Sequence, residues 1–207
     1  MPLGANMLLS SAYGADKGAN NAGNYVVATE RSAHDSSTLW AATRRGRLFI
    51  SKNANAEPES AVTFTRIDTA TQPTRFVSGI AIDGSNPNHA FLSYSGYNAY
   101  AAAAGTAPGH VFEATYDPVS GTTTWKNLDY NLGDEPITDI ARDAKSGDLY
   151  VSTDFGVATL KTGSSTWVPA AAGLPSAATY GLTIDSNARV LYAATHGRGI
   201  WKLDLSK

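Results

Sequence analysis

The chain has 207 residues, with 16 Lys and Arg against 18 Asp and Glu and a formal net charge of -2. This near-neutral balance gives no basic footprint for nucleic acid or an anionic membrane, so we expect neither as a partner. The chain contains no cysteine, which excludes disulfides, thiolate metal sites and cysteine nucleophiles.

The N-terminal stretch has no basic region, and its apolar run is limited to Met7–Leu9. It therefore predicts neither a signal peptide nor a membrane-spanning segment. The lack of cysteine fits a secreted bacterial protein that needs no disulfides, and it also fits a cytosolic one. If the protein is exported, its signal would lie outside this sequence. Residues 7–11 are expected to form a strand, followed by a loop rich in Gly, Asn and Ala.

Four segments further along the chain repeat one pattern, in which two short apolar strands flank a small polar turn. The segments are Thr38–Ser51, His89–Thr115, Asp148–Lys161 and Val190–Leu203. Their aromatic anchor residues, Trp40, Phe91, Tyr150 and Tyr192, are separated by 51, 59 and 42 residues. The longest separation holds an Ala- and Gly-rich insertion, Ala99–Gly109. Periods of about 40–50 residues are typical of β-propeller blades.

Further strands flank each of these segments. Apolar strands ending in polar turns precede them, at Val26–Ser37, Phe76–Asn88, Ile137–Gly147 and Tyr180–Arg189. Outer strands follow the first three, at Val62–Asp68, Thr122–Tyr130 and Ser165–Ala170, but none follows the fourth. We therefore predict an all-β fold, a single β-propeller domain of about four four-stranded antiparallel units, near 25–75, 76–136, 137–177 and 178–205. The strand at 7–11 would close the ring, or another chain would complete it.

These repeats resemble the Asp-box β-propellers, the bacterial neuraminidase-repeat group that includes sialidases, xyloglucanase-type glycoside hydrolases and sortilin-like receptors. The Asp box is a Ser-x-Asp-x-Gly-x-x-Trp hairpin between the third and fourth strands of a blade. Ser51-Lys52-Asn53 leading to Phe64 is a degenerate copy, and weaker copies run from Val119 to Trp125 and from Thr162 to Trp167. The resemblance implies a secreted, carbohydrate-associated propeller similar to the C-terminal part of large bacterial proteins. The fold hosts many activities, so it does not define a reaction.

One face of such a propeller would gather carboxylates from the turns and the connections between blades. Glycosidases place two carboxylates about 5–10 Å apart around the bond they cleave. Asp154 with Asp134 or Glu135 is therefore a candidate catalytic pair. The competing interpretation is that these residues cap turns or pair with neighbouring arginines.

The same face would also collect cationic and aromatic side chains that suit a glycan. Arginine binds carboxylates through a two-pronged fork, and tyrosine rings stack on ligands. The candidate ligand-binding residues are Arg44, Arg45, Tyr97, Tyr100, His196 and Arg198. No two of the four histidines have metal-ligand spacing, and there is no P-loop or dinucleotide fingerprint, so we expect no metal and no cofactor.

Two functional hypotheses follow from these residues. The first is a carbohydrate-associated propeller that binds a glycan on this loop face, and any enzymatic activity would then be that of a glycosidase, a hydrolase. The alternative is a non-catalytic structural or protein-interaction propeller domain that is a fragment of a larger protein. A homo-oligomer is a further candidate form of the chain.

Overall fold

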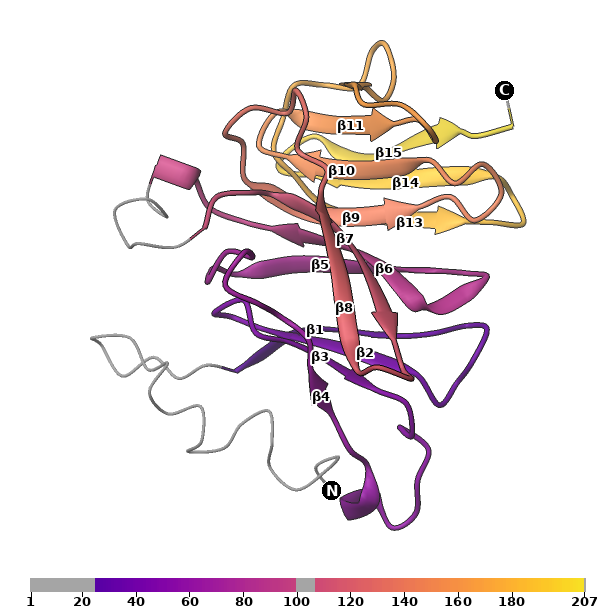
Figure 1. Cartoon of the computed structure of the whole chain (residues 1–207). Helices are drawn as coiled ribbons and strands as arrows, with labels where there is room; N and C mark the ends of the chain where they lie inside the picture. Colours follow the sequence, from indigo (N-terminus) through magenta and orange to yellow (C-terminus); the bar gives the residue numbers. More distant parts are fainter. Residues whose placement is uncertain (1–24, 100–106, 207) are drawn as a thin grey trace.

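The computed structural model describes residues 25–99 and 107–206. The predicted strand at 7–11 and Tyr100 lie outside these residues. The described residues form four antiparallel sheets of consecutive strands, stacked one on the next as propeller blades (Figure 1). The predicted all-β propeller fold is therefore confirmed.

The first three blades have four strands and the fourth has three. Blade 1 contains β1 (Val26–Arg31), β2 (Leu39–Thr43), β3 (Leu48–Ser51) and β4 (Thr65–Arg66). Blade 2 contains β5 (Val77–Asp83), β6 (Asn86–Tyr94), β7 (Val111–Asp117) and β8 (Thr122–Asn127). Blade 3 contains β9 (Ile137–Arg142), β10 (Leu149–Thr153), β11 (Gly156–Leu160) and β12 (Trp167–Pro169). Blade 4 contains β13 (Thr179–Asp185), β14 (Val190–Thr195) and β15 (Gly199–Asp204).

Apolar side chains cover both faces of the inner blades, because each sheet is packed between two neighbours. Alternate residues of a strand point to opposite faces, so successive residues of β10 enter different cores. Val151 packs toward blade 2 with Ile140 and Trp167, whereas Tyr150 packs toward blade 4 with Leu191. The strands of blade 3 consequently lack the apolar–polar alternation of a half-exposed sheet.

The aromatic anchor residues show the direction of stacking. Trp40 is buried against blade 2, where its indole N–H donates a 2.9 Å hydrogen bond to the carbonyl of Pro87. Phe91 and Tyr150 are buried against blades 3 and 4 respectively. The equivalent Tyr192 of blade 4 is 39% exposed. Each anchor therefore packs on the following blade, and Tyr192 points away from blade 3.

The inner strands are fastened by Asp139 on β9. Its carboxylate accepts hydrogen bonds of 2.8 Å from the backbone N–H groups of Ile140 and Leu182, and Leu182 belongs to blade 4. Burial raises the pKa of Asp139, and these two hydrogen bonds offset only part of that rise. On the other side, Gly79 of blade 2 lies so close that a Cβ there would be 2.8 Å from Oδ1 of Asp139.

Ion pairs join the blades at the opposite ends of these strands. Arg142 of blade 3 pairs with Asp83 of blade 2 at 3.2 Å. Arg189 of blade 4 grips Asp143 of blade 3 through two hydrogen bonds, of 2.5 and 2.6 Å. Such two-pronged arginine–carboxylate pairs fix orientation as well as distance.

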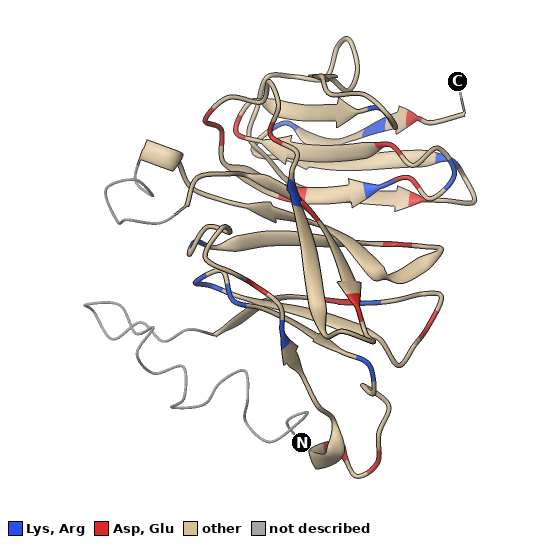
Figure 2. Ribbon diagram, in the orientation of Figure 1, with Lys and Arg blue, Asp and Glu red and all other residues tan. Residues whose placement is uncertain are grey.

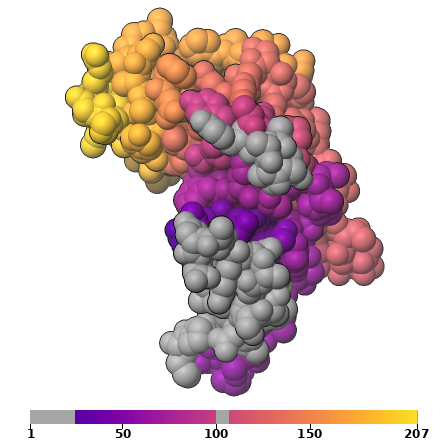
Figure 3. Space-filling model, turned by 90° about the vertical axis from the view of Figure 1, so that its left-hand side faces the viewer, coloured from indigo at the N-terminus to yellow at the C-terminus, as the bar shows by residue number. Residues whose placement is uncertain are grey.

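The four blades follow one another along an arc. Blade 1 and blade 4 lie at its opposite ends, as the order of colours from purple to yellow shows in Figures 1 and 3. At the blade 1 end, Val62 and Phe64, from the segment that leads into β4, are buried with Ala41 and Phe49. In blade 4, the third strand, β15, is the edge strand of the sheet.

Candidate interaction site

Two surfaces of the molecule can be considered as functional sites: the loop face predicted from the sequence, and the free end of blade 4. The loop face contains the turns that follow β2, β6, β10 and β14, on the left in Figure 1. Charged residues of both signs are interspersed over the blades (Figure 2). The described residues contain no group of three or more His, Asp or Glu side chains placed to hold a metal ion. The helices within the described ranges include none that is long and apolar enough to span a membrane.

Arg44 and Arg45 line a cleft of about 430 Å³ between blades 1 and 2. A third arginine, Arg75, lines the same cleft and was not predicted from the sequence. Its guanidinium donates to the carbonyls of Gly96 and Gly109, and burial lowers its pKa. No sequence motif surrounds Arg75, because its role depends on two carbonyls that the chain brings together only on folding.

Arg198 and His196 belong to the turn between β14 and β15, so the structure places them at the other end of the arc from Arg44. The backbone N–H of His196 donates a 2.7 Å hydrogen bond to the carbonyl of Ala178. Its imidazole packs edge-on against the ring of Tyr180, with 5.9 Å between centroids. Tyr97 is partly exposed in the insertion after β6. The structure does not bring these ligand-binding candidates into one pocket with Arg44 and Arg45.

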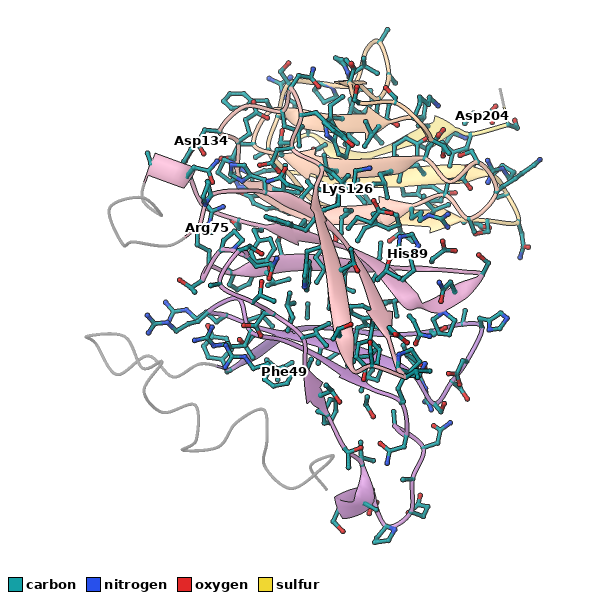
Figure 4. All side chains as sticks on the ribbon, in the orientation of Figure 1. Phe49, Arg75, His89, Lys126, Asp134 and Asp204 are labelled. Atoms are coloured by element: carbon teal, nitrogen blue, oxygen red, sulfur yellow. The ribbon has the colours of Figure 1, made fainter. Side chains whose placement is uncertain are left out.

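Asp134 is used to hold the insertion that follows β6. Its carboxylate accepts hydrogen bonds from the backbone N–H groups of Asn98, at 2.6 Å, and Ala99, at 3.3 Å. It also contacts Nε2 of the buried His110 at 3.0 Å. Partial desolvation raises the pKa of Asp134, but the hydrogen bonds outweigh it and the net shift is downward. Figure 4 shows Asp134 and Arg75 on the same side of the molecule and His89 on the opposite side.

The other two candidate carboxylates lie nearer to blade 3. Glu135 lines a hollow of about 220 Å³ together with Phe155 and Trp167. Asp154 is half-buried in the turn between β10 and β11 and does not line that hollow. Asp154 also does not line the cleft of Arg44 and Arg45. The use of Asp154 with Asp134 or Glu135 as a catalytic pair stays a prediction.

Blade 4 exposes an apolar face at positions that other blades bury. Ile200 is 77% exposed and Tyr192 39% exposed. Val157, which is equivalent to Ile200 in blade 3, is buried against blade 4. Tyr192, Ala194 and Ile200 lie on the same face, because Ala194 pairs with Ile200 and Tyr192 with Lys202 across β14 and β15. Lys202 and Asp204 are the charged side chains that this register adds to the face.

A cavity of about 310 Å³ lies between blades 3 and 4, beside β15. It is lined by Val157 and the segment Ala170–Leu174 from blade 3 and by apolar side chains of blade 4. These apolar residues are Leu191, Ala193, Trp201 and Leu203, and Lys202 of β15 also lines the cavity. Sequence reasoning missed this cavity. The one signal in the sequence was the lack of an outer strand in the fourth unit.

Comparison with known proteins supports the fold through similar solved structures. No protein-family model matches the chain, and no curated protein matches it. Among solved structures, the chain is similar to the β-propeller domain of Cps50 (Swd1) from Myceliophteria thermophila, with a TM-score of 0.61 and 13% identity over 87% of this chain and 54% of that one.

Two further similar structures come from assemblies. A chain of the nidogen/laminin complex has a TM-score of 0.61 and 15% identity over 89% of this chain and 62% of that chain. A chain of the COPII outer coat vertex on membranes has a TM-score of 0.64 and 13% identity over 91% of this chain and 48% of that chain. The chain thus spans about half the length of the structures it resembles. These similarities and the stacked blades define the protein as a β-propeller.

Proposed function

We propose that this chain is a non-catalytic protein-interaction β-propeller module that binds its partner through the free end of blade 4. The observation that carries the proposal is the exposed face with Tyr192 and Ile200. The same positions are buried against the next blade elsewhere in the molecule. Exposed contiguous apolar surface on a soluble domain marks an interaction site, and the pattern here suits another β-sheet.

The loop face supports a non-catalytic function, because its best-placed carboxylate does not have the properties of a glycosidase acid. A glycosidase needs one carboxyl group whose pKa is raised, so that it can act as an acid near neutral pH. Asp134 has a lowered pKa and its oxygens accept three hydrogen bonds. Its environment therefore favours a structural role in holding the insertion.

The experiment is sedimentation velocity over a wide concentration range, with a second copy of the chain as the probe. We expect reversible self-association that Ile200→Asp abolishes, because a charge in the middle of the face must be desolvated on docking. Val119→Asp is the matched control, since Val119 is an exposed β-branched residue in a turn of blade 2. A chain that stays monomeric and instead hydrolyses or binds members of a glycan panel contradicts the proposal.

A second candidate function is binding of a carboxylate-bearing glycan at the cleft of Arg44, Arg45 and Arg75. Three guanidinium groups around one cleft favour an anionic ligand. A glycan array with the parent chain and Arg44→Gln tests it. Binding that is unchanged by the substitution removes the cleft as the site.

A relationship to the Asp-box propellers, and with it a secreted bacterial location, is the finer proposal. Supporting it, Asn53 stands at the place of the box aspartate and fastens the hairpin: its Oδ1 accepts from the backbone N–H of Thr63 at 2.9 Å. The Ser51 hydroxyl accepts from the backbone N–H of Asn53 at 3.3 Å. Asn53→Asp tests it: the acceptor for Thr63 is kept and the donor to the Ala61 carbonyl is lost. A hairpin suited to the box aspartate should tolerate this exchange, with a free energy of unfolding within about 1 kcal/mol of the parent.

A further inference from the structure

The outer strands of the complete blades share one backbone connection. The residue after each outer strand donates its N–H to the third strand: Ile67 to Leu48, Leu128 to Val111 and Ala170 to Val157, each at 2.8–2.9 Å. In blade 4 the residue equivalent to Val157 is Ile200, because Thr153 pairs with Gly156 as Thr195 pairs with Gly199. No strand of the described residues lies beyond β15 to donate to Ile200.

The outer strands also share an aromatic side chain three residues before that donor. Phe64, Trp125 and Trp167 occupy this position. Phe64 directly precedes β4, whereas Trp125 and Trp167 lie opposite the third strand of their own blade. The indole N–H of Trp125 donates to the carbonyl of Ile67 in blade 1, and that of Trp167 donates to Leu128 in blade 2. Each tryptophan thereby locks its strand to the preceding blade.

The cavity beside β15 is the empty counterpart of the place that Trp167 fills. Trp167 clusters with Leu149, Val151 and Leu160 of its own blade and with Val111 and Leu128 of blade 2. When blade 4 is aligned with blade 3 by strand pairing, the equivalent residues of blade 4 are Leu191, Ala193 and Leu203. The equivalents in the preceding blade, blade 3, are Val157 and Ala170. All five line the cavity.

Trp201 gives the cavity an aromatic side chain that has an equivalent in blade 2. Trp201 is equivalent to Phe112, which meets Trp125 edge-to-face with 6.5 Å between ring centroids and an interplanar angle of 77°. Aromatic pairs in this geometry attract one another beyond their area of contact. An aromatic side chain that entered the cavity would make the same contact with Trp201.

We infer that blade 4 accepts an extended segment of a partner protein as its fourth strand. The segment would carry an aromatic residue, Trp or Phe, followed three residues later by an apolar residue, as in Thr124-Trp125-Lys126-Asn127-Leu128. Its backbone would extend the sheet at β15, a recurrent mode of peptide recognition, and its aromatic side chain would fill the cavity. This inference rests on the proposed function, since it specifies the chemistry of the partner.

The chain itself has no spare segment of this kind. Its matching segments, beginning at Phe64, Trp125 and Trp167, are already outer strands of blades 1–3. The first 24 residues contain a single aromatic residue, Tyr13, and the third residue after it is Asp16. A partner strand with this spacing of side chains fits both the edge and the cavity.

The test is fluorescence anisotropy with a labelled peptide of sequence TTTWKNLDY, which copies residues 122–130. We expect saturable binding to the full chain, weakened at least tenfold when the peptide tryptophan is replaced by alanine. Trp201→Ala should weaken binding severalfold. Lys202→Pro should abolish it, because the backbone N–H groups of residues 200 and 202 point away from β14 toward the open edge, where proline removes a donor. Lys202→Ala is the matched control, and a thermal melt confirms that both variants fold.

Three outcomes would overturn the inference. The first is no binding to the parent chain, or binding that neither the peptide substitution nor Lys202→Pro changes. The second is binding that appears only after residues 1–24 are deleted, which would assign the groove to the N-terminal segment of the chain itself. The third is a dimer that Lys202→Pro dissociates but the peptide does not, which would assign it to a second copy. In the first case, self-association that Ile200→Asp still abolishes would retain the proposed function while this inference fails.

Discussion

The indole N–H of Trp167 lies 2.7 Å from the carbonyl oxygen of Leu128 and donates a hydrogen bond to it. The contact joins the outermost strand of blade 3 to the connection that leaves blade 2. Trp125 makes the same contact one blade earlier, with Ile67. Side chains of the rim, as well as the inner strands, therefore set how one blade sits on the previous one.

Substitution of Trp167 should separate the packing of the indole from its hydrogen bond. Trp167→Ala leaves a cavity between blades and should lower the free energy of unfolding by about 3–5 kcal/mol. Trp167→Phe keeps most of the packing but leaves the Leu128 carbonyl unpaired, at a cost of about 1–3 kcal/mol. Urea unfolding measures both.

Val168→Ala is the neighbouring control, because the side chain of Val168 is exposed and its loss should change stability by less than about 0.5 kcal/mol. Equal losses for Trp167→Ala and Val168→Ala would show that the rim contact is irrelevant to stacking.

Gly79 and Gly181 hold equivalent places on the inner strands of blades 2 and 4, yet they should respond differently to alanine. A Cβ at Gly79 would meet Asp139 and Ile140 of blade 3 at 2.8–3.1 Å, whereas one at Gly181 would meet only the Cβ of Ala194 at 3.9 Å. Gly79→Ala should therefore destabilise by about 1–3 kcal/mol through overpacking.

Gly181→Ala should be neutral or slightly stabilising, because alanine reduces the freedom of the unfolded chain. Thermal melts of the two single variants are sufficient. Similar changes in melting temperature for both variants would show that blades 2 and 3 can accommodate a Cβ at Gly79 without loss of stability.

The repeat period and the strand pattern predicted the blades correctly, because alternating apolar residues and turn signals act over a few positions. The contacts between blades were not predictable in the same way. Nothing near Gly79 in the sequence indicates that Asp139, sixty residues later, needs the space. The site shows the same division: Arg44 and Arg45 were found from a turn, whereas Arg75 and His110 acquire their partners only when distant loops meet.

Asp134→Ala should loosen the insertion after β6. It removes the acceptor of Asn98 and Ala99 and leaves Nε2 of the buried His110 unpaired, so we expect a loss of about 1–3 kcal/mol. Amide hydrogen exchange should rise at Asn98 and Ala99. Asp154→Ala, at the half-buried turn of blade 3, should change stability by less than about 0.5 kcal/mol. The structural role fails if Asp154→Ala costs as much as Asp134→Ala.

The pair of Arg189 and Asp143 should make the junction of blades 3 and 4 sensitive to acid. The hydrogen bonds from Arg189 hold the pKa of Asp143 well below its usual value. The folded chain therefore binds this proton more weakly than the unfolded chain, so the stabilisation is complete above the ordinary carboxyl pKa of about 3.9 and is lost as the pH falls below it. Asp143→Asn should lower the free energy of unfolding at neutral pH, because the half-buried Arg189 keeps only the Leu205 carbonyl and loses its charged partner.

The free energy of unfolding of Asp143→Asn should also depend less steeply on pH between about 2 and 5 than that of the parent. Asp185→Asn removes an exposed carboxylate from a turn of blade 4 and serves as the control. Urea titrations at several pH values give both quantities. A parallel pH dependence for Asp143→Asn and the parent would show that this pair does not carry the acid sensitivity of the blade 3–blade 4 junction.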